Sequence, residues 1–152
     1  MKLLVLAVGK PKKNWAREAC EEYLQRLRGY VSLGFESVPP AKGNPSQSSS
    51  REGKSLLGSI NSGDSVVLLD ERGSSLESRG FSKKIMALLG SARGRVVCVV
   101  GGAYGVSSEV RARADFTLRL SEMTLPHELA LVLLLEQLYR AYAIASGHPY
   151  HH

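Results

Sequence analysis

Two histidines and a tyrosine in the last third of this 152-residue chain have side chains able to accept or donate a proton. His127 begins an apolar segment predicted to be a helix, and Tyr150 and His151 lie just beyond its end, after Gly147. A histidine at a helix N-terminus stays neutral because the helix dipole disfavours its charge, so it can take up a proton. The plainer alternative is that His127 only closes the loop before the helix.

A glycine-rich loop lies upstream of these residues. Residues 101–105 read Gly-Gly-Ala-Tyr-Gly and directly follow the apolar run Val96–Val100. Glycines let a backbone approach a ligand closely and take positive φ. The spacing differs from the dinucleotide-binding pattern, and the loop does not follow the first strand. An ordinary turn is therefore an equal alternative.

Two further loops also follow predicted strands. Asp70 and Glu71 come after Val66–Leu69 and are candidates for a general base or a metal ligand. Adjacent side chains in such a turn point apart, which favours a solvated charge cluster that includes Arg72. The other loop, Ser121–Pro126, directly precedes His127. No Cys/His spacing resembles a zinc site, and no metal is expected.

The segments that must position these loops alternate between strand and helix. Strands are expected at 2–8, 33–38, 66–69, 96–100 and 116–120, and helices at 14–28, 51–61, 78–90, 107–113 and 127–145. This order predicts an α/β fold with a mainly parallel sheet flanked by helices, in a single domain over 1–152. Ligands bind beyond the carboxyl ends of strands in such sheets, and all three loops lie there.

Local signals add two finer expectations. The Gly/Ser-rich stretch 39–50 has the composition of a mobile segment. Thr124 is a plausible N-cap of the last helix, with Pro126 in the first turn, where its missing N–H costs nothing.

The last predicted helix is apolar almost all round. Leu129–Leu135 is an unbroken apolar run, and Glu136 and Arg140 are spaced to form a pair. Such a helix is either buried within its own domain or packed against a second subunit, and the second arrangement is favoured. The aromatic and histidine-rich end favours a functional tail, although His152 has the character of a purification-tag remnant.

Composition narrows the class of protein. The net charge of +6 and the pI near 9.5 suggest an anionic partner such as nucleic acid, and basic residues are concentrated in the first 28 positions. Cys20 and Cys98 are expected to be buried thiols in a reducing compartment. The opening apolar run predicts a buried strand rather than a signal peptide, and no segment is expected to span a membrane.

Five ordered segments resemble the RlmH family of small SPOUT-class methyltransferases, which act on large-subunit ribosomal RNA. The resemblance covers the whole length, including the opening Lys-Leu-x-x-x-Ala-Val-Gly. The segments are Leu68–Gly73, Val100–Gly105, Leu118–His127, Glu136–Ala141 and His148–His151.

This resemblance implies a homodimer with a C-terminal trefoil knot. It implies that S-adenosyl-L-methionine methylates N3 of a pseudouridine in helix 69 of 23S rRNA, on assembled ribosomes. Catalytic roles beside the target base would fall to His127, Tyr150 and His151: a histidine would take the N3 proton, or the tyrosine would orient a uracil carbonyl. The cofactor would be held by Leu69, Gly101, Gly102, Gly105, Ser121, Glu122, Met123, Thr124, Leu125 and Pro126.

The sequence also departs from the family pattern. Leu131 stands where many relatives are expected to carry a basic residue that touches the RNA or the neighbouring subunit. Two alternatives therefore remain beside the enzyme: a non-catalytic ribosome or RNA binder that keeps the fold, and a SPOUT methyltransferase with another target nucleotide. A cytoplasmic location is the simplest expectation, although an organellar protein without its transit peptide would look the same.

Overall fold

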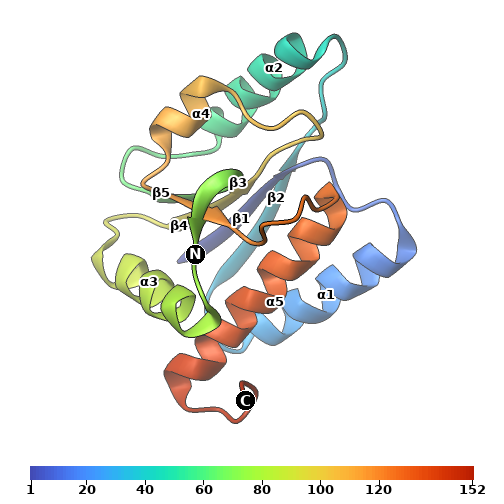
Figure 1. Ribbon diagram of the computed structural model, residues 1–152. Coiled ribbons are helices and arrows are strands. Elements are labelled where there is room, and N and C mark those ends of the chain that lie inside the picture. The colour runs from blue at the N-terminus through green and yellow to red at the C-terminus, as the bar shows by residue number, and fades with distance from the viewer.

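Five parallel strands form the middle layer of the computed structural model, which describes residues 1–152 (Figure 1). Their order across the sheet is β2-β1-β4-β3-β5, and every neighbouring pair is parallel. The strands are β1 (Leu3–Val8), β2 (Leu33–Val38), β3 (Ser65–Ser75), β4 (Val96–Val100) and β5 (Phe116–Arg119). The prediction of a mainly parallel α/β sheet is confirmed.

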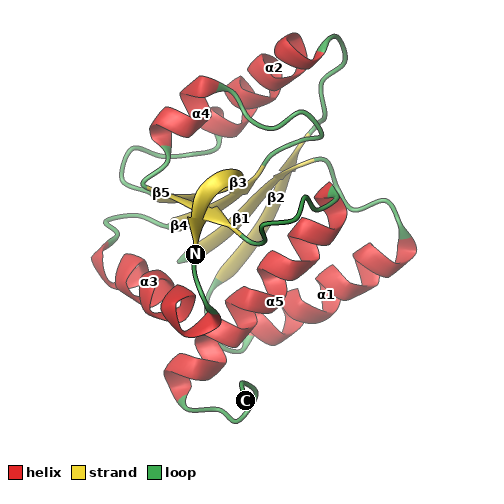
Figure 2. Ribbon diagram, viewed as in Figure 1, coloured by secondary structure: helices red, strands yellow, loops and turns green.

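Helices cover both faces of this sheet (Figure 2). Three of them, α1, α3 and α5, lie on one face, and α2 and α4 lie on the other (Figure 1). The helices are α1 (Asn14–Arg28), α2 (Pro45–Gly58), α3 (Ser78–Ser91), α4 (Ser108–Arg113) and α5 (His127–Ser146). The outer layers explain why the central strands are apolar on both sides.

The core is divided into two clusters by the central strands. Every residue of β1 and β4 is buried. Alternate residues point to opposite faces, so Leu3 and Val5 pack towards α5 while Leu4 and Leu6 pack towards α2. An unbroken apolar run is therefore what a strand between two helical layers requires.

The serine-rich stretch before α2 differs from the expectation. The helix begins at Pro45, although the sequence predicted a mobile segment to residue 50 and a helix only from 51. Asn44 caps the helix because its side chain accepts a hydrogen bond from the Gln47 backbone N–H at 2.9 Å. Proline at the first helical position fixes φ for this start, which outweighs the low helix propensity of the serines.

Strand β3 continues further than predicted and breaks its pairing with β5. Both Leu69 and Ser74 face Leu118, so the residues between them bulge out of the sheet. The bulge lies tightly on the neighbouring strand: a Cβ on Gly73 would come 2.7 Å from backbone atoms of Thr117 and Leu118. The bulge within β3 is therefore held against β5, beside the end of the sheet.

The start of α5 corrects one local prediction. The N-cap is Pro126 and no side chain caps the helix, so the expected Thr124 cap is wrong. Leu131 is 0% exposed and belongs to the core, so its side chain does not form part of the surface. The Glu136–Arg140 pair is confirmed, with 2.5 Å between Oε1 and an Arg140 guanidinium nitrogen.

By length and composition alone, α5 is the one helix long and apolar enough to cross a membrane, a test that the core helix of a globular domain also passes. Its most apolar stretch is 44% buried within this single chain. The helix packs on the sheet and against α1 and α3, so its apolar character serves the core at least in part (Figure 1).

Candidate functional site

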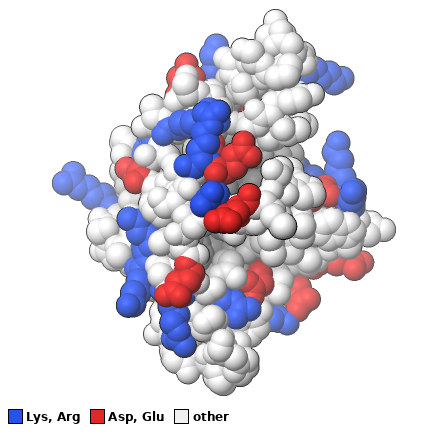
Figure 3. All heavy atoms as spheres, in the orientation of Figure 1, with Lys and Arg blue, Asp and Glu red and all other residues white.

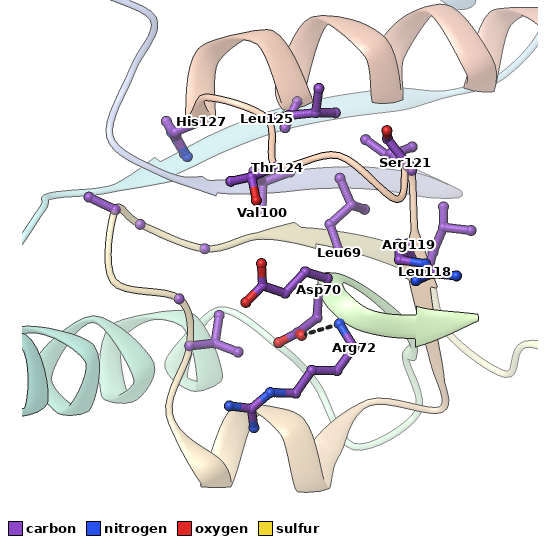
Figure 4. Close-up of a pocket in the computed structure, with 18 of the residues that line it drawn as sticks. Leu69, Asp70, Arg72, Val100, Leu118, Arg119, Ser121, Thr124, Leu125 and His127 are labelled. Atoms are coloured by element: carbon purple, nitrogen blue, oxygen red, sulfur yellow. Dashed lines mark hydrogen bonds between the residues drawn. The ribbon is translucent and has the colours of Figure 1, made fainter. Parts of the chain in front are cut away.

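A cavity of about 490 Å³ opens at the carboxyl ends of β3, β4 and β5 (Figure 4). Each of the three loops singled out from the sequence contributes to its wall. Their meeting is a consequence of the parallel sheet, because the carboxyl ends of neighbouring strands lie at one edge. Volumes of this size are typical of sites for small molecules.

Most of the predicted cofactor residues line this cavity. They are Leu69, Gly101, Gly102, Gly105, Ser121, Met123, Thr124 and Leu125. Two other predicted residues, Glu122 and Pro126, belong to the same loop but do not line the wall. Leu69, Thr124 and His127 project towards one space from a strand, a loop and a helix (Figure 4).

The glycine loop keeps its shape through its own contacts. Gly105 has φ +78°, and its N–H donates to the Gly102 carbonyl at 3.1 Å. A Cβ on Gly101 would lie 2.6 Å from Cγ1 of Val106, so a side chain at this position would have to displace that methyl group. The loop is thus a hydrogen-bonded turn that also forms one wall of the cavity. The two alternatives from the sequence, an ordinary turn and a loop beside a ligand site, are therefore compatible.

The wall combines apolar side chains with backbone groups. Leu69, Val100, Leu118 and Leu120 provide apolar surface, and the loop Ser121–Pro126 provides backbone donors and acceptors. The Met123 N–H is already taken, since it donates to Ser121 Oγ at 2.9 Å. An apolar surface with backbone groups at its edge suits a flat heterocycle attached to polar groups, so these residues fit an adenosine-containing cofactor.

One ion pair in the wall was not predicted from the sequence. Asp70 Oδ2 lies 3.0 Å from Arg111 Nε, and Asp70 Oδ1 accepts the Arg72 backbone N–H at 2.8 Å. The Asp70 side chain is only 6% exposed, so the predicted solvated charge cluster does not include Asp70, although Glu71 and Arg72 are exposed. Arg111 lies on α4 in no recognisable motif, and only the packing of α4 beside the β3 loop reveals its role.

The cysteines do not take part in this site. Both are buried free thiols, as predicted. Burial, with a smaller contribution from Glu128 and Glu21, raises the pKa of Cys20 to about 11, and burial raises the pKa of Cys98 to about 12. Neither thiol forms a nucleophilic thiolate near neutral pH.

The C-terminal tail folds back on the far half of α5. The Tyr150 ring packs edge-on against Tyr139, with centroids 4.7 Å apart, and its hydroxyl donates to Glu136 Oε1 at 3.1 Å. His151 Nδ1 lies 3.0 Å from an Arg140 nitrogen. Burial, then hydrogen bonds with Tyr23 and Glu136, raises the pKa of Tyr150. Its hydroxyl stays protonated near neutral pH and acts as a donor rather than a base.

The structure therefore separates the three predicted catalytic residues. His127 lines the cavity at the start of α5, whereas His151 contacts Arg140, which lies about 20 Å further along the helix axis. His151 instead lines a second cavity, which shares the wall Leu118–Leu120 with the first. One chain does not bring all three side chains to one point.

Basic residues approach the cavity from the N-terminal part of the chain. The β1–α1 loop reaches the start of α5, where the Lys12 backbone N–H donates to Glu128. Lys10, Lys12 and Lys13 are exposed there. Figure 3 shows Lys and Arg side chains spread over one face, with acidic side chains among them near its centre. Of the basic residues predicted to cluster in the N-terminal part, Lys12 is placed next to the start of α5, where His127 lines the cavity.

Comparisons with known proteins agree with this geometry. The family described as "Predicted SPOUT methyltransferase" matches residues 1–151. Proteins named ribosomal RNA large subunit methyltransferase H are similar over 99% of both chains: that of Bdellovibrio bacteriovorus is 39% identical and that of Clostridium kluyveri 40%. A solved probable methylase family protein from Haemophilus influenzae shares the fold, with TM-score 0.59 and 12% identity. The match covers 95% of this chain and 66% of that longer one.

Proposed function

The chain belongs to the SPOUT methyltransferase family, and we propose that it transfers a methyl group from S-adenosyl-L-methionine to large-subunit ribosomal RNA. The observation that carries the proposal is the convergence of three strand-end loops on one cavity. The similarity to proteins named ribosomal RNA large subunit methyltransferase H extends over nearly the whole chain and supports the same proposal.

The cofactor is proposed to occupy the cavity at the ends of β3, β4 and β5. Leu69 and Leu125 would contact the adenine, while the loops at 101–105 and 121–126 would offer backbone groups. When bound, the cofactor supplies a methyl group on a positively charged sulfur. The protein then has mainly to align this carbon with the attacking atom and to exclude water.

The proposed acceptor is N3 of pseudouridine 1915 in helix 69 of 23S rRNA. This nitrogen must lose its proton before it attacks. His127 lines the cofactor cavity at the start of α5, so its imidazole is placed to act as the proton acceptor. Tyr150, held protonated, suits the orientation of a uracil carbonyl, and His151 suits a contact beside it.

A homodimer is proposed to complete this site. Within one chain, His127 in the cofactor cavity lies apart from Tyr150 and His151 in the tail, so one chain alone does not assemble all three residues. The apolar helix α5 is less than half buried in a single chain, which supports a second copy as its cover. The tail of one subunit would then reach the cofactor cavity of its partner. The trefoil knot and a cytoplasmic location belong to the same proposal.

Calorimetric titration of S-adenosyl-L-methionine tests the proposal, with Gly101→Trp as the blocked control. An indole at this position would fill the space beside Val106 and the cavity. We expect one site per subunit or per dimer in the parent and none in the folded variant. Methyl transfer to ribosomes that lack the modification is the second step. A folded dimer that binds no cofactor would exclude the enzyme and favour the RNA-binding alternative.

A further inference from the structure

Glu52 is a buried carboxyl group that the proposed mechanism does not use. It lies on α2, is 6% exposed, and its Oε2 accepts the Ala41 backbone N–H at 3.0 Å. Its other oxygen, Oε1, is fully buried and accepts no hydrogen bond from the protein. A buried acceptor without a donor is costly, and native proteins rarely keep one without a reason.

The unpartnered oxygen lies against the glycine loop. A Cβ on Gly102 would come 2.7 Å from Glu52 Oε1 and 3.2 Å from Oε2. No other residue supplies the nearest atoms at this point. Position 102 therefore requires glycine because its backbone packs closely against the Glu52 carboxyl group, and not only to let a ligand approach it.

The residue after Glu52 contacts the other end of the same loop. A Cβ on Gly53 would overlap Ser107 Oγ, the hydroxyl that caps α4 by accepting the Val110 N–H at 3.3 Å. The pair Glu52-Gly53 thus touches the loop where it leaves β4 and again where it enters α4. The helix α2 supports the loop from the side of the sheet opposite α5.

We propose that Glu52 is a positioning residue for the cofactor loop, whose free oxygen accepts a backbone N–H of residues 102–104 when S-adenosyl-L-methionine is bound. This inference rests on the proposed function. The bound form would satisfy Oε1, so part of the binding free energy would come from a hydrogen bond formed behind the loop. A ligand that selects this loop position gains affinity from a residue it does not touch.

Glu52→Gln changes one atom of this arrangement. The Ala41 N–H keeps the amide oxygen at the Oε2 position, so the new NH₂ group must face Gly102. A donor then stands where an acceptor is needed, in a side chain of nearly the same shape. We expect the dissociation constant for S-adenosyl-L-methionine to rise about tenfold, the loss of one hydrogen bond to a charged group. Glu109→Gln, on the exposed part of α4, is the matched control and should bind like the parent.

A double-mutant cycle tests the same contact without relying on the carboxyl group alone. Gly102→Ala should weaken cofactor binding strongly in the parent, because its Cβ meets Glu52. In the Glu52→Ala background that obstacle is absent, so Gly102→Ala should raise the dissociation constant for the cofactor at most a few-fold. Melting temperatures of all four proteins show which of them are folded.

The outcomes separate this inference from the proposed function. A parent that binds the cofactor, with Glu52→Gln equally tight, overturns the positioning role and leaves the function in place. The same holds if Gly102→Ala weakens binding equally in both backgrounds. A folded parent that binds no cofactor overturns the proposed function itself, and the inference with it. Faster hydrogen exchange of the loop amides in Glu52→Gln with cofactor present would support the proposal directly.

Discussion

Asp70 and Arg111 show how single residues stabilise the wall of the cavity. The carboxylate is buried in the wall and receives one hydrogen bond from the Arg111 side chain and one from the Arg72 backbone. Arg111→Met would remove the charged partner and leave the backbone bond. We expect the free energy of unfolding to fall by about 2 kcal/mol, the usual cost of an under-satisfied buried acceptor. Urea unfolding at neutral pH measures this change.

The control for this prediction is Arg72→Met. The Arg72 side chain is exposed and only its backbone N–H contacts Asp70, so its loss should change stability by less than about 0.5 kcal/mol. Equal effects of the two substitutions would show that the Asp70–Arg111 pair contributes little. Cofactor affinity measured in parallel would report whether the β3 loop keeps its position.

Tyr150 gives a second prediction for a single residue, because its loss should affect methyl transfer but not cofactor binding. The ring packs on Tyr139 and the hydroxyl donates to Glu136, far from the cofactor cavity of the same chain. Tyr150→Phe keeps the ring and removes the donor. We expect unchanged cofactor affinity and methyl transfer to ribosomes slower by at least about tenfold. Weaker cofactor binding in this variant would contradict the assigned role.

Among the elements, the starts of β3 and β4 are tied together by Asp64 and Arg95. The Asp64 side chain is 1% exposed, and one carboxylate oxygen lies 2.7 Å from an Arg95 guanidinium nitrogen. Burial alone would raise the pKa of Asp64. Hydrogen bonds from the Arg95 side chain and backbone and from Asn61, with the charge of Arg95, outweigh burial and lower this pKa. The ionised form is therefore favoured by folding.

This lowered pKa predicts how stability depends on pH. Because the folded pKa lies below that of the unfolded chain, about 3.9, the stabilisation is fully present above that pH and is lost as pH falls through the folded value. Asp64→Asn should reduce the free energy of unfolding by about 3 kcal/mol at pH 7. The difference from the parent should shrink below about pH 4. A difference that stays constant in urea unfolding from pH 7 to pH 3 would contradict this account.

At the scale of the whole molecule, the separation of His127 from the tail predicts complementation between subunits. One variant would carry Gly101→Trp and the other Tyr150→Phe with His151→Ala, so neither homodimer has a complete site. In a mixed dimer the intact cavity of one subunit would meet the intact tail of the other. Purified mixed dimers should recover about half of the parent activity, since each holds one complete site where the parent dimer holds two.

Activity of purified mixed dimers on unmodified ribosomes measures this effect. Each subunit carries a different affinity tag, so that only mixed dimers are collected. Their failure to methylate, with cofactor still bound at one site, would show that the tail acts within its own chain. In that case the second cavity, where His151 shares the wall Leu118–Leu120 with the first, would be the route by which the tail reaches the cofactor.

Much of the fold could be predicted from local patterns. The apolar runs at β1 and β4 gave their own bounds to within a residue, and α1 matched its predicted range. Predictions were wrong where capping and pairing overrode composition. Asn44 and Pro45 start α2 within a serine-rich stretch, and the pairing of Ser74 with Leu118 prolongs β3 past its charged turn. Both features depend on contacts that composition does not report.

The sequence by itself determined the three loops that form the cavity, because glycine, proline and apolar runs act over a few neighbouring positions. Only the tertiary structure decided which distant side chains support them. Arg111 reaches Asp70 and Glu52 reaches Gly102 across 41 and 50 positions of the chain, from helices packed on the far side of the sheet. Pairs so far apart in the chain produce no periodic pattern in the sequence. The packing of the layers alone brings them into contact, and it also places the tail at the end of α5 opposite His127.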